Sequence, residues 1–175
     1  MRKWTLFFIL IGVLILAACN DEDKAEETVE KDIKELVQEY STGDFENISA
    51  SITSSELIVT YEDDEKEVYQ LPEDEFFLSI APFIEVTHPC ANHSLTGCQG
   101  ELVNEAFEVE IIDSEGNIVL NETLQTMDNG FIDLWLPRND EYAVTITQDG
   151  KVAEETISTY DGDNTCITTM QLKDM

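Results

Sequence analysis

Basic residues are scarce in this sequence. Nine lysines and arginines stand against 38 aspartates and glutamates in 175 residues, and the formal net charge at pH 7 is −29. Proteins that bind nucleic acid or anionic lipid headgroups need a basic surface to neutralise phosphates. We therefore expect no nucleic-acid partner. A surface this acidic keeps a protein soluble in a salty or alkaline exterior, and it attracts cations.

Histidine is scarcer still, because the chain contains only His88 and His93, both in one segment. With both histidines in one segment, the sequence offers little from which to form the Ser-His-Asp triad of a serine hydrolase. Because acidic residues are so frequent, pairs of carboxylates occur by chance, and they are no evidence for a glycosidase. We predict that the protein is not an enzyme in the turnover sense.

Only one long apolar run is present, at the N-terminus. It follows Arg2 and Lys3 and ends in the sequence Leu-Ala-Ala-Cys at Cys19. The run is shorter than the roughly 18 residues that a spanning helix needs, and the pattern is typical of a lipoprotein signal peptide over residues 1–18. Cleavage before Cys19 and lipidation of its sulfur would tether the chain to the outer face of a bacterial membrane. We predict a lipid-anchored protein on the extracytoplasmic face of the cell membrane.

The next part of the chain predicts a spacer and a small α+β domain. Residues 19–27 are polar and acid-rich, as in a disordered spacer. Apolar side chains recur at helical spacing over residues 28–41, and two β-rich runs, ELIVTY and EVYQL, predict a hairpin. We assign residues 28–75 to this domain. Because so small a core commonly needs a partner or a second copy of itself, we predict a homodimer through residues 28–75.

Residues 76–175 are almost entirely β-rich. Turn signals containing Gly116, Gly130 and Gly150 separate segments with alternating apolar residues, which favours an antiparallel β-sandwich domain. The β-rich segments are FFLSI, LVNEAFEVEII, NIVLNETLQT, GFIDLWL, YAVTITQ, KVAEETIST and CITTMQL. Part of this region is similar to transthyretin-like and carboxypeptidase-regulatory-like sandwich domains, a likeness of fold only. Residues 82–100 lack a strand pattern, and we expect a long loop there; the fold class is α+β.

Candidate metal ligands are concentrated in this loop. The segment THPCANHSLTGC holds both histidines, His88 and His93, and two cysteines, Cys90 and Cys98, while Cys166 lies far downstream. Thiolate and imidazole select copper and zinc over calcium and magnesium. Three thiolates would suit monovalent copper, and we rank the two histidines below the cysteines as ligands.

The cysteines also permit two other functions. With Cys19 lipidated, three cysteines remain in an oxidising compartment and cannot all pair within one molecule. If Cys90 and Cys98 form a purely structural disulfide, the protein would be a β-sandwich interaction module. Cycling of the same pair would make a thiol-disulfide redox protein, although a Cys-x-x-Cys motif is absent. Met170 offers a thioether near Cys166, but we expect it to pack in the core.

Three segments of the chain resemble the CueP family of exported copper-binding, copper-resistance proteins. They are LSIAPFIEVTHPCANHSLTGCQGEL, GFIDLWLP and DNTCIT. The resemblance implies an N-terminal domain similar to the dimerisation domain of periplasmic disulfide isomerases, and a C-terminal β domain that binds copper through Cys90, Cys98 and Cys166. It also implies that the protein protects the cell envelope, by reducing divalent copper with its thiols or by holding and delivering monovalent copper. The lipidation motif that ends at Cys19 sets this chain apart from soluble family members. It favours sequestration of copper at the membrane surface over delivery of copper by a freely diffusing protein.

Overall fold

The computed structural model describes residues 32–175. The predicted signal peptide (residues 1–18), the acidic spacer (residues 19–27) and the lipidation site at Cys19 lie outside the described residues. Within residues 32–175, the one helix is too short and too polar to cross a membrane.

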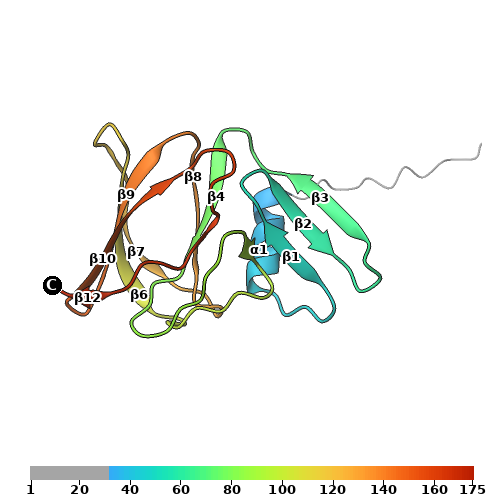
Figure 1. Cartoon of the computed structure of the whole chain (residues 1–175), viewed down its shortest axis with the longest axis horizontal. Coiled ribbons are helices and arrows are strands. Elements are labelled where there is room, and N and C mark those ends of the chain that lie inside the picture. The colour runs from blue at the N-terminus through green and yellow to red at the C-terminus, as the bar shows by residue number, and fades with distance from the viewer. Residues whose placement is uncertain (1–31) are drawn as a thin grey trace, which may run out of the picture. The chain divides into compact units, whose positions relative to one another are not determined.

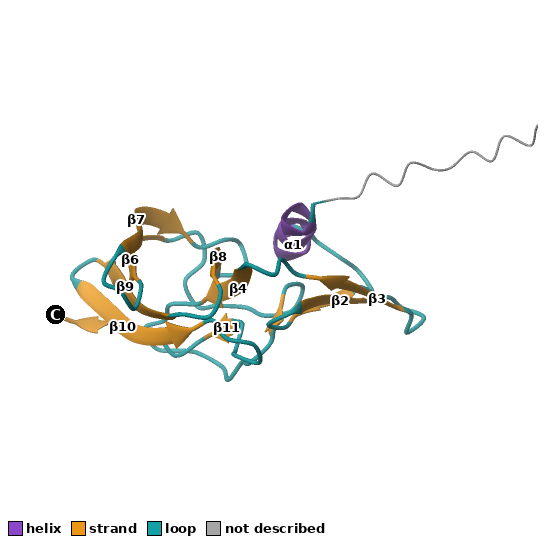
Figure 2. Ribbon diagram, turned by 90° about the horizontal axis from the view of Figure 1, so that it is seen from above, coloured by secondary structure: helices purple, strands orange, loops and turns teal. Residues whose placement is uncertain are grey.

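The N-terminal part is a helix packed on a four-stranded antiparallel sheet. Helix α1 (Ile33–Thr42) begins where the Asp32 carboxylate accepts a hydrogen bond from the Lys34 N–H, and it ends at Gly43. The sheet has the order β3-β2-β1-β5 and consists of β1 (Ser49–Ile52), β2 (Glu56–Thr60), β3 (Lys66–Gln70) and β5 (His93–Ser94). The predicted helix and the β2–β3 hairpin are confirmed, although β1 was not predicted. Figure 2 shows α1 covering one face of this sheet.

The remaining strands form two further sheets (Figure 1). The five-stranded sheet has the order β12-β10-β9-β6-β7, and the three-stranded sheet has the order β11-β4-β8. Their strands are β4 (Glu75–Ile80), β6 (Ala106–Ile112), β7 (Ile118–Gln125), β8 (Ile132–Pro137), β9 (Glu141–Gln148), β10 (Lys151–Ser158), β11 (Cys166–Ile167) and β12 (Lys173–Asp174). Buried apolar residues from both sheets form one continuous core, so the predicted α+β class with a sandwich is confirmed.

Strand β4 belongs to two hydrophobic cores at once. Phe76 and Leu78 point into the sandwich core, and Phe77 points into the core beneath α1. Phe77 lies opposite Trp135 of β8, and the two rings meet edge to face with centroids 5.3 Å apart. Side chains alternate between the two faces of a strand, so one strand serves both cores. The sandwich of the same chain therefore covers apolar surface of the helix and hairpin. The small size of the N-terminal core is then no longer a reason to expect a second copy of the chain.

Two local predictions were wrong. The loop over residues 82–100 contains the two-residue strand β5, which pairs with β1 at the edge of the N-terminal sheet. The last β-rich segment is not one strand: it splits into β11, an isolated bridge between Phe83 and Gln171, and β12. β11 also pairs with β4 in parallel, whereas the other strand pairs are antiparallel. Both errors concern short strands whose pairing partners lie far away in the chain.

Candidate metal centre

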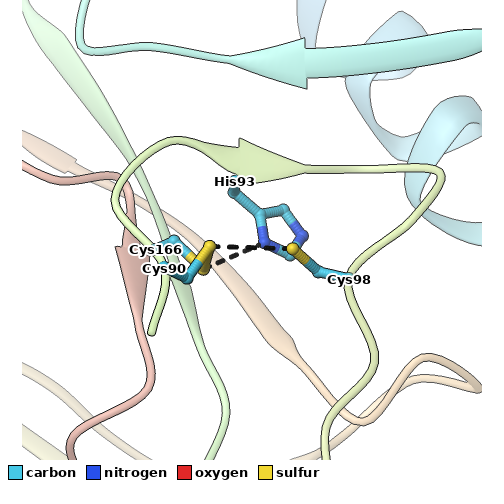
Figure 3. A group of neighbouring side chains, drawn as sticks. All are labelled: Cys90, His93, Cys98 and Cys166. Atoms are coloured by element: carbon cyan, nitrogen blue, oxygen red, sulfur yellow. Dashed lines mark hydrogen bonds between the residues drawn. A yellow bond between two sulfur atoms is a disulfide. The ribbon is translucent and has the colours of Figure 1, made fainter. Parts of the chain in front are cut away.

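Four candidate ligands from separate segments gather at one place. The ligand atoms of Cys90, His93, Cys98 and Cys166 all lie within 4.8 Å of one another (Figure 3). His93 is on β5 and Cys166 is on β11, while Cys90 and Cys98 lie in the loop on either side of β5. The site therefore forms where an edge strand of the N-terminal sheet meets an edge strand of the sandwich.

The separations between the ligand atoms suit a single ion. The Cys90 and Cys98 sulfurs are 3.6 Å apart, and His93 Nδ1 is 3.5 Å from the Cys166 sulfur. A tetrahedral ion with metal–sulfur bonds near 2.3 Å would place its ligand atoms about 3.7 Å apart. The two measured separations match this spacing.

The structure shows two of the three sulfurs joined. Cys90 and Cys166, separated by 76 positions, form a disulfide with Cα atoms 5.6 Å apart. Cys98 is the free thiol and is half-buried. The alternative pairing, Cys90 with Cys98, is thus not the one present, although the Cys98 sulfur lies close to Cys90. A four-ligand centre requires reduction of the disulfide, whereas the oxidised state offers only Cys98 and His93.

His93 has the environment of a ligand rather than of an ordinary core residue. Its side chain is 0% exposed, and its ring centroid lies 4.4 Å from that of Phe131. Burial, with a smaller contribution from His88, lowers the pKa of His93 to about 4, so the imidazole is neutral at neutral pH and keeps a lone pair. Nδ1 contacts only the Cys166 sulfur, and Nε2 is the one buried side-chain nitrogen or oxygen among residues 32–175 without a hydrogen bond. Buried polar atoms are almost always paired, so Nε2 is an exception, whereas Nδ1 faces the sulfurs and is the nitrogen that would bind an ion.

The other two candidates lie apart from this group. The His88 ring is not among the clustered ligand atoms; its centroid is 6.4 Å from that of Phe131, and its backbone oxygen accepts a hydrogen bond from the Thr168 hydroxyl. Met170 is buried in the sandwich core, as expected. The structure therefore brings together all three predicted cysteines and one of the two histidines.

A carboxylate that the sequence did not single out holds the start of the loop. Glu101 accepts hydrogen bonds from the N–H groups of Ile84 at 2.6 Å and Glu85 at 3.0 Å. Partial burial acts to raise the pKa of the Glu101 carboxyl, but the backbone donors outweigh it and the pKa is lowered. The contact spans 17 positions, so no local pattern could have revealed it. Glu101 closes the base of the loop that carries the ligands.

Comparison with known proteins places this chain in one family. The family described as "Periplasmic copper-binding protein CueP" matches residues 32–171. The crystal structure of S.CueP is similar with a TM-score of 0.78 and 38% sequence identity, over 83% of this chain and 91% of that chain. Comparison with the curated proteins found no match. The resemblance of the three sequence segments to the CueP family is thus confirmed, and this chain belongs to the CueP family of periplasmic copper-binding proteins.

Proposed function

We propose that this protein binds one monovalent copper ion outside the cytoplasm through Cys90, Cys98, Cys166 and His93, and serves copper homeostasis by sequestering that ion. The observation that carries the proposal is the convergence of four soft or borderline ligand atoms within 4.8 Å. His88, whose ring lies outside this group, is assigned at most an auxiliary role.

The ligand set favours monovalent copper over harder ions. Three sulfurs and one imidazole match the preference of monovalent copper for soft ligands. Carboxylates, which calcium and magnesium prefer, are absent from the cluster of residues described above. The strongly acidic chain would raise the local cation concentration around the molecule without taking part in coordination.

Copper reduction is a second candidate function, favoured by the disulfide. Two divalent copper ions would each take one electron from the thiols of Cys90 and Cys166. The two sulfurs would lose their protons and form the Cys90–Cys166 bond, which is the pairing that the structure contains. The product ion is the one that sulfur ligands prefer. The reaction is stoichiometric, because each disulfide must be reduced again before the next two ions react.

Binding and reduction are tested by the same set of variants. In the fully reduced protein, Cys90→Ser, Cys98→Ser and Cys166→Ser should each weaken monovalent copper binding in competition with a colorimetric chelator, and His93→Ala should also weaken it. His88→Ala is the matched control and should bind as the wild type does. Unchanged binding in all three cysteine variants would refute the metal site.

Reduction is followed separately, by adding divalent copper to the reduced protein and trapping monovalent copper with the chelator. We expect two monovalent ions per disulfide formed. Wild-type yield in Cys166→Ser would contradict the role given to the Cys90–Cys166 pair. Refolding of a disulfide-scrambled substrate without metal would instead support a general thiol-disulfide redox protein.

The proposed location and assembly extend the family's periplasmic placement. We propose that Cys19 carries a lipid that holds the protein at the membrane surface, because residues 1–19 have the lipoprotein signal pattern. Cys19→Ser should move the protein from the membrane fraction to the soluble fraction. Dimerisation through residues 28–75 also stays a prediction, and a monomer mass by light scattering would disprove it.

A further inference from the structure

One buried hydroxyl, that of Thr165, lies between the strands that carry two of the proposed ligands. Thr165 directly precedes Cys166 and is 0% exposed. Its hydroxyl donates a hydrogen bond to the Ile52 carbonyl at 2.7 Å and accepts one from the His93 N–H at 3.0 Å. A single oxygen therefore connects β1 and β5 of the N-terminal sheet to the residue before β11.

This hydroxyl bonds to both members of one residue pair in the N-terminal sheet. Ile52 and His93 face each other in the antiparallel β1–β5 pair, and the Ile52 carbonyl and the His93 N–H each form a hydrogen bond with the Thr165 hydroxyl. Ile52 and His93 are each 0% exposed, so water is not available to replace the hydroxyl as a partner. Loss of the hydroxyl would remove one hydrogen-bond partner from a buried donor and from a buried acceptor, and the strands would shift to restore these bonds.

Movement of these strands would act directly on the ligand atoms. His93 Nδ1 lies 3.5 Å from the sulfur of Cys166, the next residue after Thr165. The backbone N–H groups of Thr165 and Cys166 both donate to the Ala91 carbonyl, at 3.0 and 3.1 Å. Ala91 follows Cys90, so the same short segment also holds a third ligand residue in place.

We infer that Thr165 is a positioning residue for the copper centre: its hydroxyl sets the separation between the strand of His93 and the strand of Cys166. The inference deepens the proposed function and rests on it. Thr165 does not touch the ion; it acts through the backbone of His93. Substitution to valine replaces the hydroxyl with a methyl group and keeps the backbone bonds to Ala91, which do not depend on the side chain.

A second buried threonine provides a matched control. Thr159 is also 0% exposed, and its hydroxyl also donates to a backbone carbonyl, that of Pro137 at 3.0 Å, and accepts from a backbone N–H, that of Asp140 at 3.2 Å. None of its partners is a proposed ligand or a neighbour of one in the chain. Thr165→Val and Thr159→Val thus make the same chemical change at the same burial, but only one of them lies beside the centre.

The test compares monovalent copper binding by four reduced full-length proteins: wild type, Thr165→Val, Thr165→Ser and Thr159→Val. Affinity is measured against a colorimetric chelator, and the near-ultraviolet thiolate-to-copper band reports the geometry of the centre. We expect Thr165→Val to bind copper roughly 10- to 100-fold more weakly, as loss of groups that orient metal ligands commonly does, with an altered band. Thr165→Ser, which keeps the hydroxyl, and Thr159→Val should retain the affinity and the band of the wild type.

The outcomes separate this inference from the proposed function. A wild type that does not bind monovalent copper refutes the proposed function, whereas a wild type that binds and a Thr165→Val variant with equal affinity and an unchanged band refute the positioning role. Equal weakening in Thr159→Val would show a general effect of stability and would also overturn it. If circular dichroism shows that Thr165→Val is unfolded, Thr165→Ala removes the same hydroxyl in a smaller side chain.

A measurement without metal checks the geometry independently of copper. The His93 amide should exchange its proton slowly in the metal-free wild type and in Thr165→Ser, because it donates to a buried hydroxyl. It should exchange much faster in Thr165→Val, while the Asp140 amide stays protected. Rapid exchange at His93 in the wild type would overturn the inference even if every valine variant failed to fold.

Discussion

The hairpin turn between β6 and β7 and the segments around the metal centre are held by different kinds of contact. In the hairpin, the Asp113 carboxylate accepts hydrogen bonds from the N–H groups of Glu115 at 3.0 Å and Asn117 at 2.7 Å. Gly116 has φ +87° and open space around it. Around the centre, by contrast, the turn at Gly130 packs directly on the backbone of Gly100. The hairpin closes on itself, whereas the centre depends on contacts between residues distant in the chain.

The largest expected effect comes from breaking the longest of these contacts, the Cys90–Cys166 disulfide. It spans 76 positions, and loop-closure entropy gives such a link about 4 kcal/mol of stability. Reduction of the wild type should lower the free energy of unfolding by about this amount, as measured by urea denaturation. The same reductant should have its full effect on Cys98→Ser and a clearly smaller effect on Cys166→Ser, where only a short Cys90–Cys98 link can form. Equal unfolding midpoints for oxidised and reduced wild type would show that the link contributes nothing to stability.

The two histidines provide the next contrast. His93 is fully buried between aromatic rings, whereas His88 is half-buried in the loop. His93→Ala should leave a cavity and lower the free energy of unfolding by about 3 kcal/mol, even without copper. His88→Ala should change it by less than about 0.5 kcal/mol, as for most surface positions. Similar losses in urea denaturation would mean that His88 is packed more tightly than its exposure indicates.

Two glycines test the comparison directly. Gly116 and Gly130 both have positive φ, but a Cβ at Gly130 would lie 2.8 Å from backbone atoms of Gly100, while a Cβ at Gly116 would meet nothing within 4 Å. Gly116→Ala should cost about 1 kcal/mol for the left-handed backbone alone. Gly130→Ala should cost about 2 kcal/mol more, because the neighbouring backbone must move. Thermal unfolding of the two variants measures the difference, and equal costs would contradict the close backbone approach.

The same division explains what could be predicted from the sequence. The hairpins and the sandwich strands were predicted because alternation and turn residues act over a few positions. The three cysteines were predicted as ligands from their scarcity and chemistry, and they do converge. Strand β5 was missed because two residues carry no periodic signal.

The partners of the centre are remote in sequence, which is why they escaped prediction. The Thr165 hydroxyl bonds to Ile52 across 113 positions, and the Glu101 carboxylate holds Ile84 from the far side of the loop. His93 was ranked below the cysteines because three sulfurs would suffice as ligands. Its burial depends on Phe131, just before β8, and on Phe77 of β4, and no local pattern reveals that contact. Residue type identifies ligands, but the groups that hold them in place become visible only when the chain is folded.

Two aspartates extend the contrast to pH. Asp113 lies in the β6–β7 turn, and hydrogen bonds from the side chain and backbone of Asn117 lower the pKa of its carboxyl. Asp133 lies between the hydroxyls of Ser41 at 2.6 Å and Ser79 at 2.5 Å. There, desolvation raises the pKa of the carboxyl above its ordinary value of 3.8, against the opposing effect of the two serines. A local turn thus favours the charged form of its aspartate, and a contact between distant elements disfavours it.

The smallest effect we expect is the pH dependence that Asp133 adds to stability. Between pH 3.8 and its raised pKa, the folded state binds more protons at Asp133 than the unfolded state does. Stability from this group is therefore present at low pH and is lost as the pH rises through the raised pKa. Asp133→Asn lacks this titration, so the free energy of unfolding of the wild type should rise relative to that of Asp133→Asn as the pH is lowered from neutral. The difference between the two proteins cancels the contribution of the other carboxylates, and a difference that does not vary with pH would show that desolvation does not raise the pKa of Asp133.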